Sequence, residues 1–215
     1  MHFTKLAFDE YITKVAYLIG NSLGDERISR ATARFGYDND RLKMGENLYR
    51  RVKDISEKQN KAKIKKIKMH KKRRSVESSV RRKYMKILQI ARIAFANDVL
   101  IRRALQLDGQ REASLHSWLN QVSMFASRLS SENEWMKGIA NYGISNDDIK
   151  DLLDSTEELR DVAAICEQEK ENAKKLTAIK REELKKLQGW ISDFLKIAKI
   201  ALEDQPGLYN KIKNI

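Results

Sequence analysis

The chain has 215 residues, 41% of them hydrophobic, and carries 43 Lys and Arg against 30 Asp and Glu, for a net charge of +13. A single proline and nine glycines, beside abundant Lys, Glu, Ala, Leu and Ile, indicate an all-α protein. The sequence contains no run of eighteen apolar residues, so we expect no membrane-spanning helix. Asp9 and Glu10 interrupt the apolar stretch that a signal peptide needs. Because Cys166 is the only cysteine, no intrachain disulfide can form, and we expect a cytoplasmic protein.

A first helix is predicted near the start of the chain by apolar residues spaced three and four apart. These residues are Phe8, Tyr11, Ile12, Val15 and Leu18. We expect this helix to end between Gly20 and Gly24 and a shorter helix to follow around residues 28–34. Gly36 then stops the chain, and Asp38 is placed to accept amide protons at the start of the next helix.

A long helix is predicted over residues 38–98, which contain no proline and a single glycine, Gly45. Two series with a spacing of seven run through it. One is Ile55, Ala62, Met69, Val76, Lys83 and Ile90, and the other is Val52, Gln59, Lys66, Arg73, Val80, Ile87 and Ala94. Apolar ends and a polar middle predict a coiled-coil seam that is weakest at its centre. A tight turn in that polar middle, which would fold the stretch into a hairpin, stays open as an alternative.

The second half of the chain repeats the first at a constant offset of 107 residues. "ILQIARIAFAND" at 87–98 aligns with "FLKIAKIALEDQ" at 194–205, and "RFGYDNDRLK" aligns with "NYGISNDDIK" without a gap. The second long stretch starts at Ser145, which forms a near capping box with Asp148. Its two series are Val162, Glu169, Leu176, Glu183, Trp190 and Ile197, with Leu159, Cys166, Ala173, Lys180, Leu187, Phe194 and Ala201. We therefore predict an internal duplication with repeats at 1–107 and 108–215.

The fold class we predict is an elongated, tandem-duplicated helical bundle, in which two long antiparallel coiled-coil-like helices pair about a pseudo-twofold axis as one structural unit. Short helices are expected to cap an apolar cluster on each long helix. The clusters are Ile87, Ile90, Ile93, Ala94 and Phe95, and Phe194, Ile197, Ile200, Ala201 and Leu202. Burying large apolar side chains such as these stabilises a fold by roughly 1.5–3 kcal/mol each.

The repeats differ in charge. Residues 1–107 hold 27 Lys and Arg against 11 Asp and Glu, whereas the remainder holds 16 against 19. The excess lies in residues 58–86, with fourteen basic residues and one acid, Glu77. The candidate polyanion-binding residues are Lys61, Lys63, Lys65, Lys66, Lys68, Lys71, Lys72, Arg73, Arg74, Arg81, Arg82 and Lys83.

Two interpretations of this basic run stand side by side. It is a solvated helix face offset by acids of the second repeat, which are Glu167, Glu169, Glu171, Glu182 and Glu183. Alternatively, it binds nucleic acid or another polyanion through phosphate contacts without reading bases. Tyr84 is the only aromatic residue in the run, which disfavours base stacking, and no zinc-finger or helix-turn-helix pattern is present.

A membrane-active helix is a lesser alternative. "GWISDFLKIAKIAL" at 189–202 has an apolar side and a charged side, as a helix at a membrane surface has. A core role is commoner for this pattern, and its recurrence in both repeats favours packing.

Catalytic and metal-binding patterns are not found. His2, His70 and His116 lie far apart in the sequence, Cys166 falls on a seam position, and no glycine-rich phosphate loop is present. Trp118, Trp135 and Trp190 lie on periodic apolar positions and are expected in the core. We predict no enzyme activity, no cofactor, no metal and no small-molecule substrate.

The motifs "FGYDNDRL", "ARIAF", "YGIS" and "AKIALEDQP" resemble those of a family of internally duplicated, all-helical bacterial proteins with no assigned function. The resemblance covers nearly the whole chain and implies no activity, and the lysine-rich middle departs from the pattern. The function we expect is a helical scaffold or assembly protein, self-associating or bound to a protein partner, whose basic surface meets an acidic partner. Non-specific nucleic-acid binding is the alternative.

Overall fold

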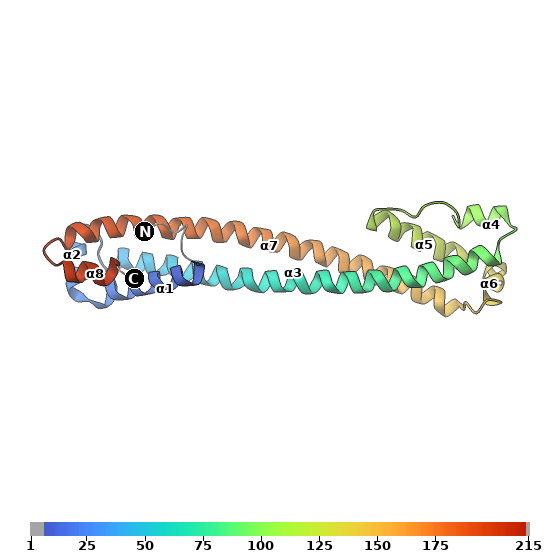
Figure 1. The fold of residues 1–215 in the computed structure, drawn as a ribbon, viewed down its shortest axis with the longest axis horizontal. Helices are drawn as coiled ribbons and strands as arrows, with labels where there is room; N and C mark the ends of the chain where they lie inside the picture. The colour runs from blue at the N-terminus through green and yellow to red at the C-terminus, as the bar shows by residue number, and fades with distance from the viewer. Residues whose placement is uncertain (1–6, 214–215) are drawn as a thin grey trace. The chain divides into compact units, whose positions relative to one another are not determined.

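The computed structural model describes residues 7–213, so His2 lies outside the described residues. Every secondary-structure element in this range is helical, which confirms the all-α prediction. The helices are α1 (Phe8–Gly24), α2 (Glu26–Ala33), α3 (Asn39–Ala94), α4 (Val99–Ala104), α5 (Leu115–Ser131), α6 (Asn133–Ala140), α7 (Asn146–Ala201) and α8 (Pro206–Lys213) (Figure 1).

The helix bounds recur at the offset that the sequence shows. Each of α5, α6, α7 and α8 begins 107 residues after its counterpart among α1 to α4. The turn before each long helix also has the same backbone conformation, with φ values of 82° at Gly36 and 80° at Gly143. Glycine enters this left-handed region without the steric cost that a Cβ atom imposes. The two halves of the chain therefore share one order of helices and turns.

The two long helices are continuous, so neither folds into a hairpin. Both begin at the predicted caps. Asp38 Oδ1 accepts a hydrogen bond from the Arg41 amide at 2.9 Å. Ser145 and Asp148 form a reciprocal capping box, in which the carboxylate accepts the Ser145 amide at 2.8 Å and Ser145 Oγ accepts the Asp148 amide at 3.2 Å.

Helices α3 and α7 pack antiparallel within each part of the chain. Lys180 donates to Ser56 Oγ at 2.8 Å and Gln59 donates to Thr177 Oγ1 at 2.9 Å, so residue numbers on α7 fall as those on α3 rise. All members of the two predicted seven-residue series are buried or half-buried on both helices. These series therefore form the seam between α3 and α7, and we use the word seam in that sense below.

The chain divides into two compact units, each built from both halves of the sequence. The terminal unit comprises residues 1–63 and 172–215, and the central unit comprises residues 64–171. The units thus differ from the two sequence repeats, because α3 and α7 each contribute one part to either unit.

The core of the terminal unit lies where α1, α2 and α8 cover the start of α3 and the end of α7. Trp190 stacks on Phe194 with ring centroids 5.2 Å apart, and Tyr37 packs against both rings. Ile28 and Phe194 are fully buried here. Apolar side chains from short helices thus enclose the end of α7, as predicted.

The core of the central unit has the same construction from the other ends of the long helices. Tyr84 lies edge-on to Trp118 and Phe125, with centroids 6.2 and 5.4 Å away. Helices α5 and α6 supply most of the cover, and Leu88 and Ile139 are fully buried.

The predicted apolar clusters are wrong at one pair of equivalent positions. Ile93 is 60% exposed and Ile200 is 55% exposed. The core is met instead by the residues two before and two after this position. In the first half these are Ala91, near the end of α3, and Phe95, directly after it, and both are buried. A helix turns by about 100° per residue, so the intervening side chain points to solvent.

Candidate polyanion-binding surface

The central unit places a basic helix against an acidic one. Residues 64–94 of α3 carry twelve Lys and Arg and one acid, Glu77, whereas residues 146–171 of α7 carry ten Asp and Glu and three Lys and Arg. Antiparallel packing brings these segments together over their length. The basic run is therefore partly neutralised inside its own unit.

Ion pairs cross between the two helices along one flank of α3. Lys65 Nζ lies 2.6 Å from a Glu169 oxygen, and Lys72 Nζ lies 3.6 Å from a Glu158 oxygen. Lys83 Nζ lies 2.6 Å from an Asp151 oxygen and donates to Ser155 Oγ at 2.8 Å. Of the acids expected to offset the run, Glu169 does so across the seam. Glu167 instead pairs with Lys170 and Glu183 with Lys186, each on its own helix.

A second set of basic side chains points away from α7. Lys68, Lys71, Arg74 and Arg82 are exposed, and none forms an ion pair among residues 7–213. Their spacing of three to eight residues places them on the outer side of α3. These four residues are called the α3 solvent face below.

Arg81 is held by its own surroundings. Its guanidinium donates to Glu77 Oε1 at 2.9 Å and lies 4.2 Å from the centroid of the Trp118 ring. An arginine stacked on tryptophan and paired with a carboxylate is stabilised in place. Arg81 is therefore a structural contact between α3 and α5 rather than a free cation.

Besides Lys83, which pairs with Asp151, two predicted cations lie on the seam. Lys66 and Arg73 are half-buried, and the Arg73 Nε atom is buried without a hydrogen-bond partner in the described part of the chain. Arg73 also lines an open groove of about 420 Å³ together with His116, Arg160 and Glu167. The hydrogen bond from Lys170 is the largest cause that lowers the pKa of Glu167, and the positive charge of Arg73 lowers it further. This groove mixes both signs of charge and has no clear preference for anions.

Lys61 and Lys63 belong to the terminal unit, so they are not grouped with the other predicted residues. Both are exposed. Burial lowers the pKa of Lys180, and the positive charge of Lys63 lowers it further. The sequence prediction therefore divides into exposed cations, seam residues and residues paired with acids.

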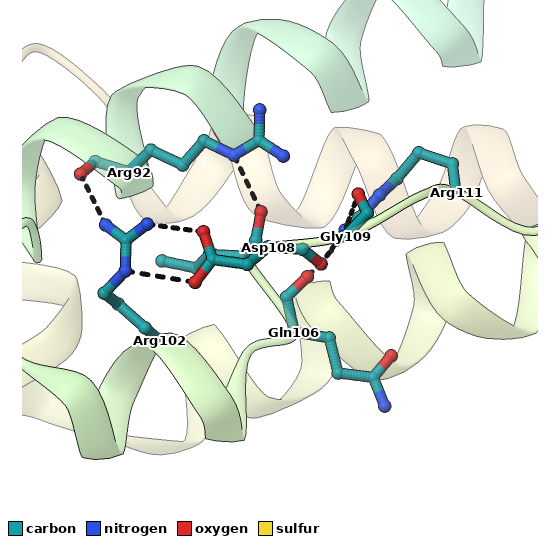
Figure 2. A network of polar contacts seen from close by, with 7 residues as sticks. Arg92, Arg102, Gln106, Asp108, Gly109 and Arg111 are labelled. Atoms are coloured by element: carbon teal, nitrogen blue, oxygen red, sulfur yellow. Dashed lines mark hydrogen bonds and ion pairs between the residues drawn. The ribbon is translucent and has the colours of Figure 1, made fainter.

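Another polar network, which the sequence reasoning missed, holds the linker between α4 and α5 (Figure 2). Arg102 forms an ion pair with Asp108, and Arg92 Nε donates to the Leu107 carbonyl at 2.7 Å. Arg111 donates to the carbonyls of Gln106, Asp108 and Gly109 at 2.6 to 3.1 Å. These contacts join residues two to fifteen positions apart within and around an irregular linker, and no regular spacing in the sequence signals them.

Among the residues that the structure describes, no cluster of three His, Cys, Asp or Glu side chains is arranged to hold a metal ion. No helix within residues 7–213 is sufficiently long and apolar to cross a bilayer.

Comparison with known protein families, with curated proteins and with solved structures found no match. The resemblance to duplicated helical bacterial proteins and the duplication itself therefore stay predictions.

Proposed function

We propose that the protein is a non-enzymatic helical scaffold or assembly component that binds an acidic partner through the α3 solvent face. The observation that carries this proposal is the division of the basic run. One flank of α3 is neutralised by Glu169, Glu158 and Asp151, whereas the opposite side keeps its cations exposed. The positive charge on that side is available to a second molecule.

The helix pair is suited to a scaffold role because it presents these cations on a continuous helix. Residues 68 to 82 of α3 span about 21 Å at 1.5 Å per residue. Exposed ion pairs contribute roughly 0.2–1 kcal/mol each, so four of them give a weak contact that salt screens. We propose a coiled-coil pairing of the internally duplicated halves as the rigid base for this contact, in a protein that acts in the cytoplasm.

Non-specific nucleic-acid binding is the second candidate. The same four cations would neutralise phosphates without reading bases, and the two arginines are suited to phosphate oxygens. The acidic segment of α7 in the same unit disfavours a nucleic acid that wraps both helices. A membrane surface is a lesser alternative, since the apolar side of residues 189–202 contributes Phe194 and Ala198 to the core of the terminal unit.

The test replaces Lys68, Lys71, Arg74 and Arg82 together by Gln. A charge-matched control replaces four other exposed cations by Gln, which are Arg34, Arg103, Lys175 and Lys185. Binding of fluorescent poly-glutamate and of duplex DNA is measured by anisotropy at about 50 and 200 mM salt, the range over which phosphate contacts weaken strongly.

We expect the α3 variant to lose about tenfold in affinity for poly-glutamate and the control to stay within about twofold of the original chain. Stronger binding of duplex DNA than of poly-glutamate, lost in the same variant, would replace the scaffold proposal by the nucleic-acid one. No binding of either polymer at low salt, or equal losses in both variants, would refute a role for this face.

A further inference from the structure

The linker between α4 and α5 occupies a defined place on the central unit. Leu107 is fully buried in the core cluster, and its carbonyl accepts a hydrogen bond from Arg92 of α3. The Asp108 carboxylate binds the Arg102 guanidinium of α4 (Figure 2). Arg111 also donates to Tyr84 Oη at 2.9 Å. A segment of turns and bends thus binds along α3 and α4 through one apolar side chain and the carboxylate that follows it.

The equivalent place on the terminal unit is an open groove. It has a volume of about 400 Å³ and lies along α7 and α8. Three of its lining residues, Ile191, Lys199 and Tyr209, are the counterparts at an offset of 107 of Tyr84, Arg92 and Arg102, which hold the linker in the central unit. We call it the α7–α8 groove.

Within residues 7–213, burial shows less cover over the α7–α8 groove than over its counterpart. Leu88 of the central unit is fully buried, whereas its counterpart Leu195 is half-buried and lines the groove. A small adjoining hollow shares Ile191 and Leu195 and is otherwise lined by Val15, Leu18 and Ile212 among others. Ile191 and Leu195 therefore give the groove an apolar floor.

The rim of the α7–α8 groove is positively charged. Lys196, Lys199 and Lys213 line it, and no acid is among the lining residues. Lys196 is paired with Asp193 at 3.3 Å, whereas Lys199 and Lys213 have no ion pair among residues 7–213. Lys213 Nζ lies 5.7 Å from the centroid of the Tyr209 ring. These two lysines are free to meet carboxylates.

We propose that the α7–α8 groove binds a short acidic peptide segment of a partner protein, with one apolar side chain on the floor and carboxylates on Lys199 and Lys213. The bound linker of the central unit is the precedent for the order of apolar and acidic residues. Lys199 stands in the place of Arg92 and Lys213 in the place of Gln106, and their positive charge favours acidic residues. This site is separate from the α3 solvent face, so either proposal stands without the other.

The probe is a fluorescein-labelled peptide of residues 105–113 in which Arg111 is replaced by Glu, because the counterpart of Tyr84 is Ile191 and offers arginine no hydroxyl. Its anisotropy is titrated with the full chain. We expect saturable binding that falls about tenfold in Lys199→Gln/Lys213→Gln and stays within about twofold in the control Lys175→Gln/Lys185→Gln. A peptide with its three acids amidated as Asn and Gln is expected to bind as weakly as the double variant does.

Filling the groove provides a test without a change of charge. Ser192 is exposed and lines the groove, so Ser192→Trp blocks it while leaving the core intact, and we expect it to weaken the peptide as the double variant does. Binding unaffected by both variants would overturn the proposal, as would no binding at all.

Two further outcomes separate the competing occupants. Loss of peptide binding in the α3 variant alone would overturn the groove proposal and support the α3 solvent face. By the offset of 107, residues 214 and 215 are the counterparts of Leu107 and Asp108, and they lie outside the described residues. Binding seen only after their deletion would show that the chain fills its own groove and would overturn a partner peptide.

Discussion

Cys166 and His70 form a polar contact across the seam of the central unit, with Sγ 3.3 Å from Nδ1. The offset of 107 residues relates this pair to Gln59 and Thr177, whose side chains are hydrogen-bonded across the seam of the terminal unit. Each unit thus has one polar pair at equivalent seam positions. Sliding the helices by one heptad would bury these polar atoms without their partners, so the pairs help to fix the register.

The first prediction is that the Cys166 thiol reacts slowly in the folded protein. Its side chain is fully buried, so a thiol reagent has to wait for local opening of the seam. Reaction with Ellman's reagent is expected to be slow in buffer and fast in urea. An exposed control is Ser75→Cys in a Cys166→Ala background, since Ser75 is exposed on the same part of α3 as His70. Equal rates for the two thiols in buffer would contradict the burial of Cys166.

The second prediction contrasts two glycines inside the long helices. A Cβ atom at Gly45 would lie 2.4 Å from the Trp190 ring, which is stacked on Phe194, whereas nothing lies within 4 Å of a Cβ at Gly189. Gly45→Ala is therefore expected to lower the free energy of unfolding by about 1–3 kcal/mol through overpacking. Gly189→Ala is expected to raise it by roughly 0.5–1 kcal/mol, because alanine favours the helix.

Urea denaturation followed by circular dichroism measures both changes. If Gly45→Ala stabilised the protein, Trp190 would move aside without a loss of free energy. That result would contradict the close packing of α3 against α7 at this point.

The third prediction concerns acid. Asp25 caps α2, and hydrogen bonds from Arg27, with a weaker one from Lys211, lower the pKa of its carboxyl to about 2 from 3.8. A carboxyl whose pKa is lower in the folded state than in the unfolded state stabilises the fold at pH values above the unfolded-state pKa of 3.8. This contribution is lost as the pH falls from 3.8 towards 2. The stability difference between the original chain and Asp25→Asn is therefore expected to shrink over that window.

The control for this prediction is Glu132→Gln. Glu132 is the counterpart of Asp25 at the N-cap of α6, and its side chain forms no capping hydrogen bond. Urea midpoints measured at several pH values are expected to give a smaller pH-dependent difference for Glu132→Gln. An equal pH dependence of the stability difference for both substitutions would show that the Asp25 cap does not cause the response to acid.

The fourth prediction concerns the linker between α4 and α5. Arg111 binds three linker carbonyls and Tyr84 Oη, so Arg111→Gln is expected to release residues 105–114 while the helices persist. Hydrogen exchange in that segment should become faster by about tenfold or more, since several charge-assisted hydrogen bonds are lost. Arg103→Gln on exposed α4 is the control and should leave exchange unchanged. Unchanged protection in Arg111→Gln would mean that Leu107, Arg92 and Arg102 anchor the linker without Arg111.

Much of the fold was predictable because it follows from local rules. Helix caps at Asp38 and Ser145 and the series with a spacing of seven depend on residues close in sequence, and the structure confirms them. The exposure of Ile93 and Ile200 was mispredicted because apolar identity alone does not give the angle of a side chain around its helix.

The contacts of the candidate sites were harder to predict, because they depend on the register between distant segments. Glu158 and Asp151 meet the basic run only once the antiparallel pairing sets them opposite Lys72 and Lys83. The groove beside Lys199 likewise depends on how α8 packs beside α7. Its likeness to the linker site rests on Tyr209, the counterpart of the Arg102 that holds Asp108. The sequence predicted a charge excess, and three-dimensional pairing decided which cations remain exposed.

The three tryptophans are distributed unequally between the two compact units. Trp190 is the sole indole of the terminal unit, where it stacks on Phe194, whereas Trp118 and Trp135 belong to the central unit. Replacing Trp118 and Trp135 by Phe would leave an emission signal from one unit alone, and replacing Trp190 would leave the other. Fluorescence melting curves of these two variants would then reveal whether the units lose structure in a single cooperative step or one after the other.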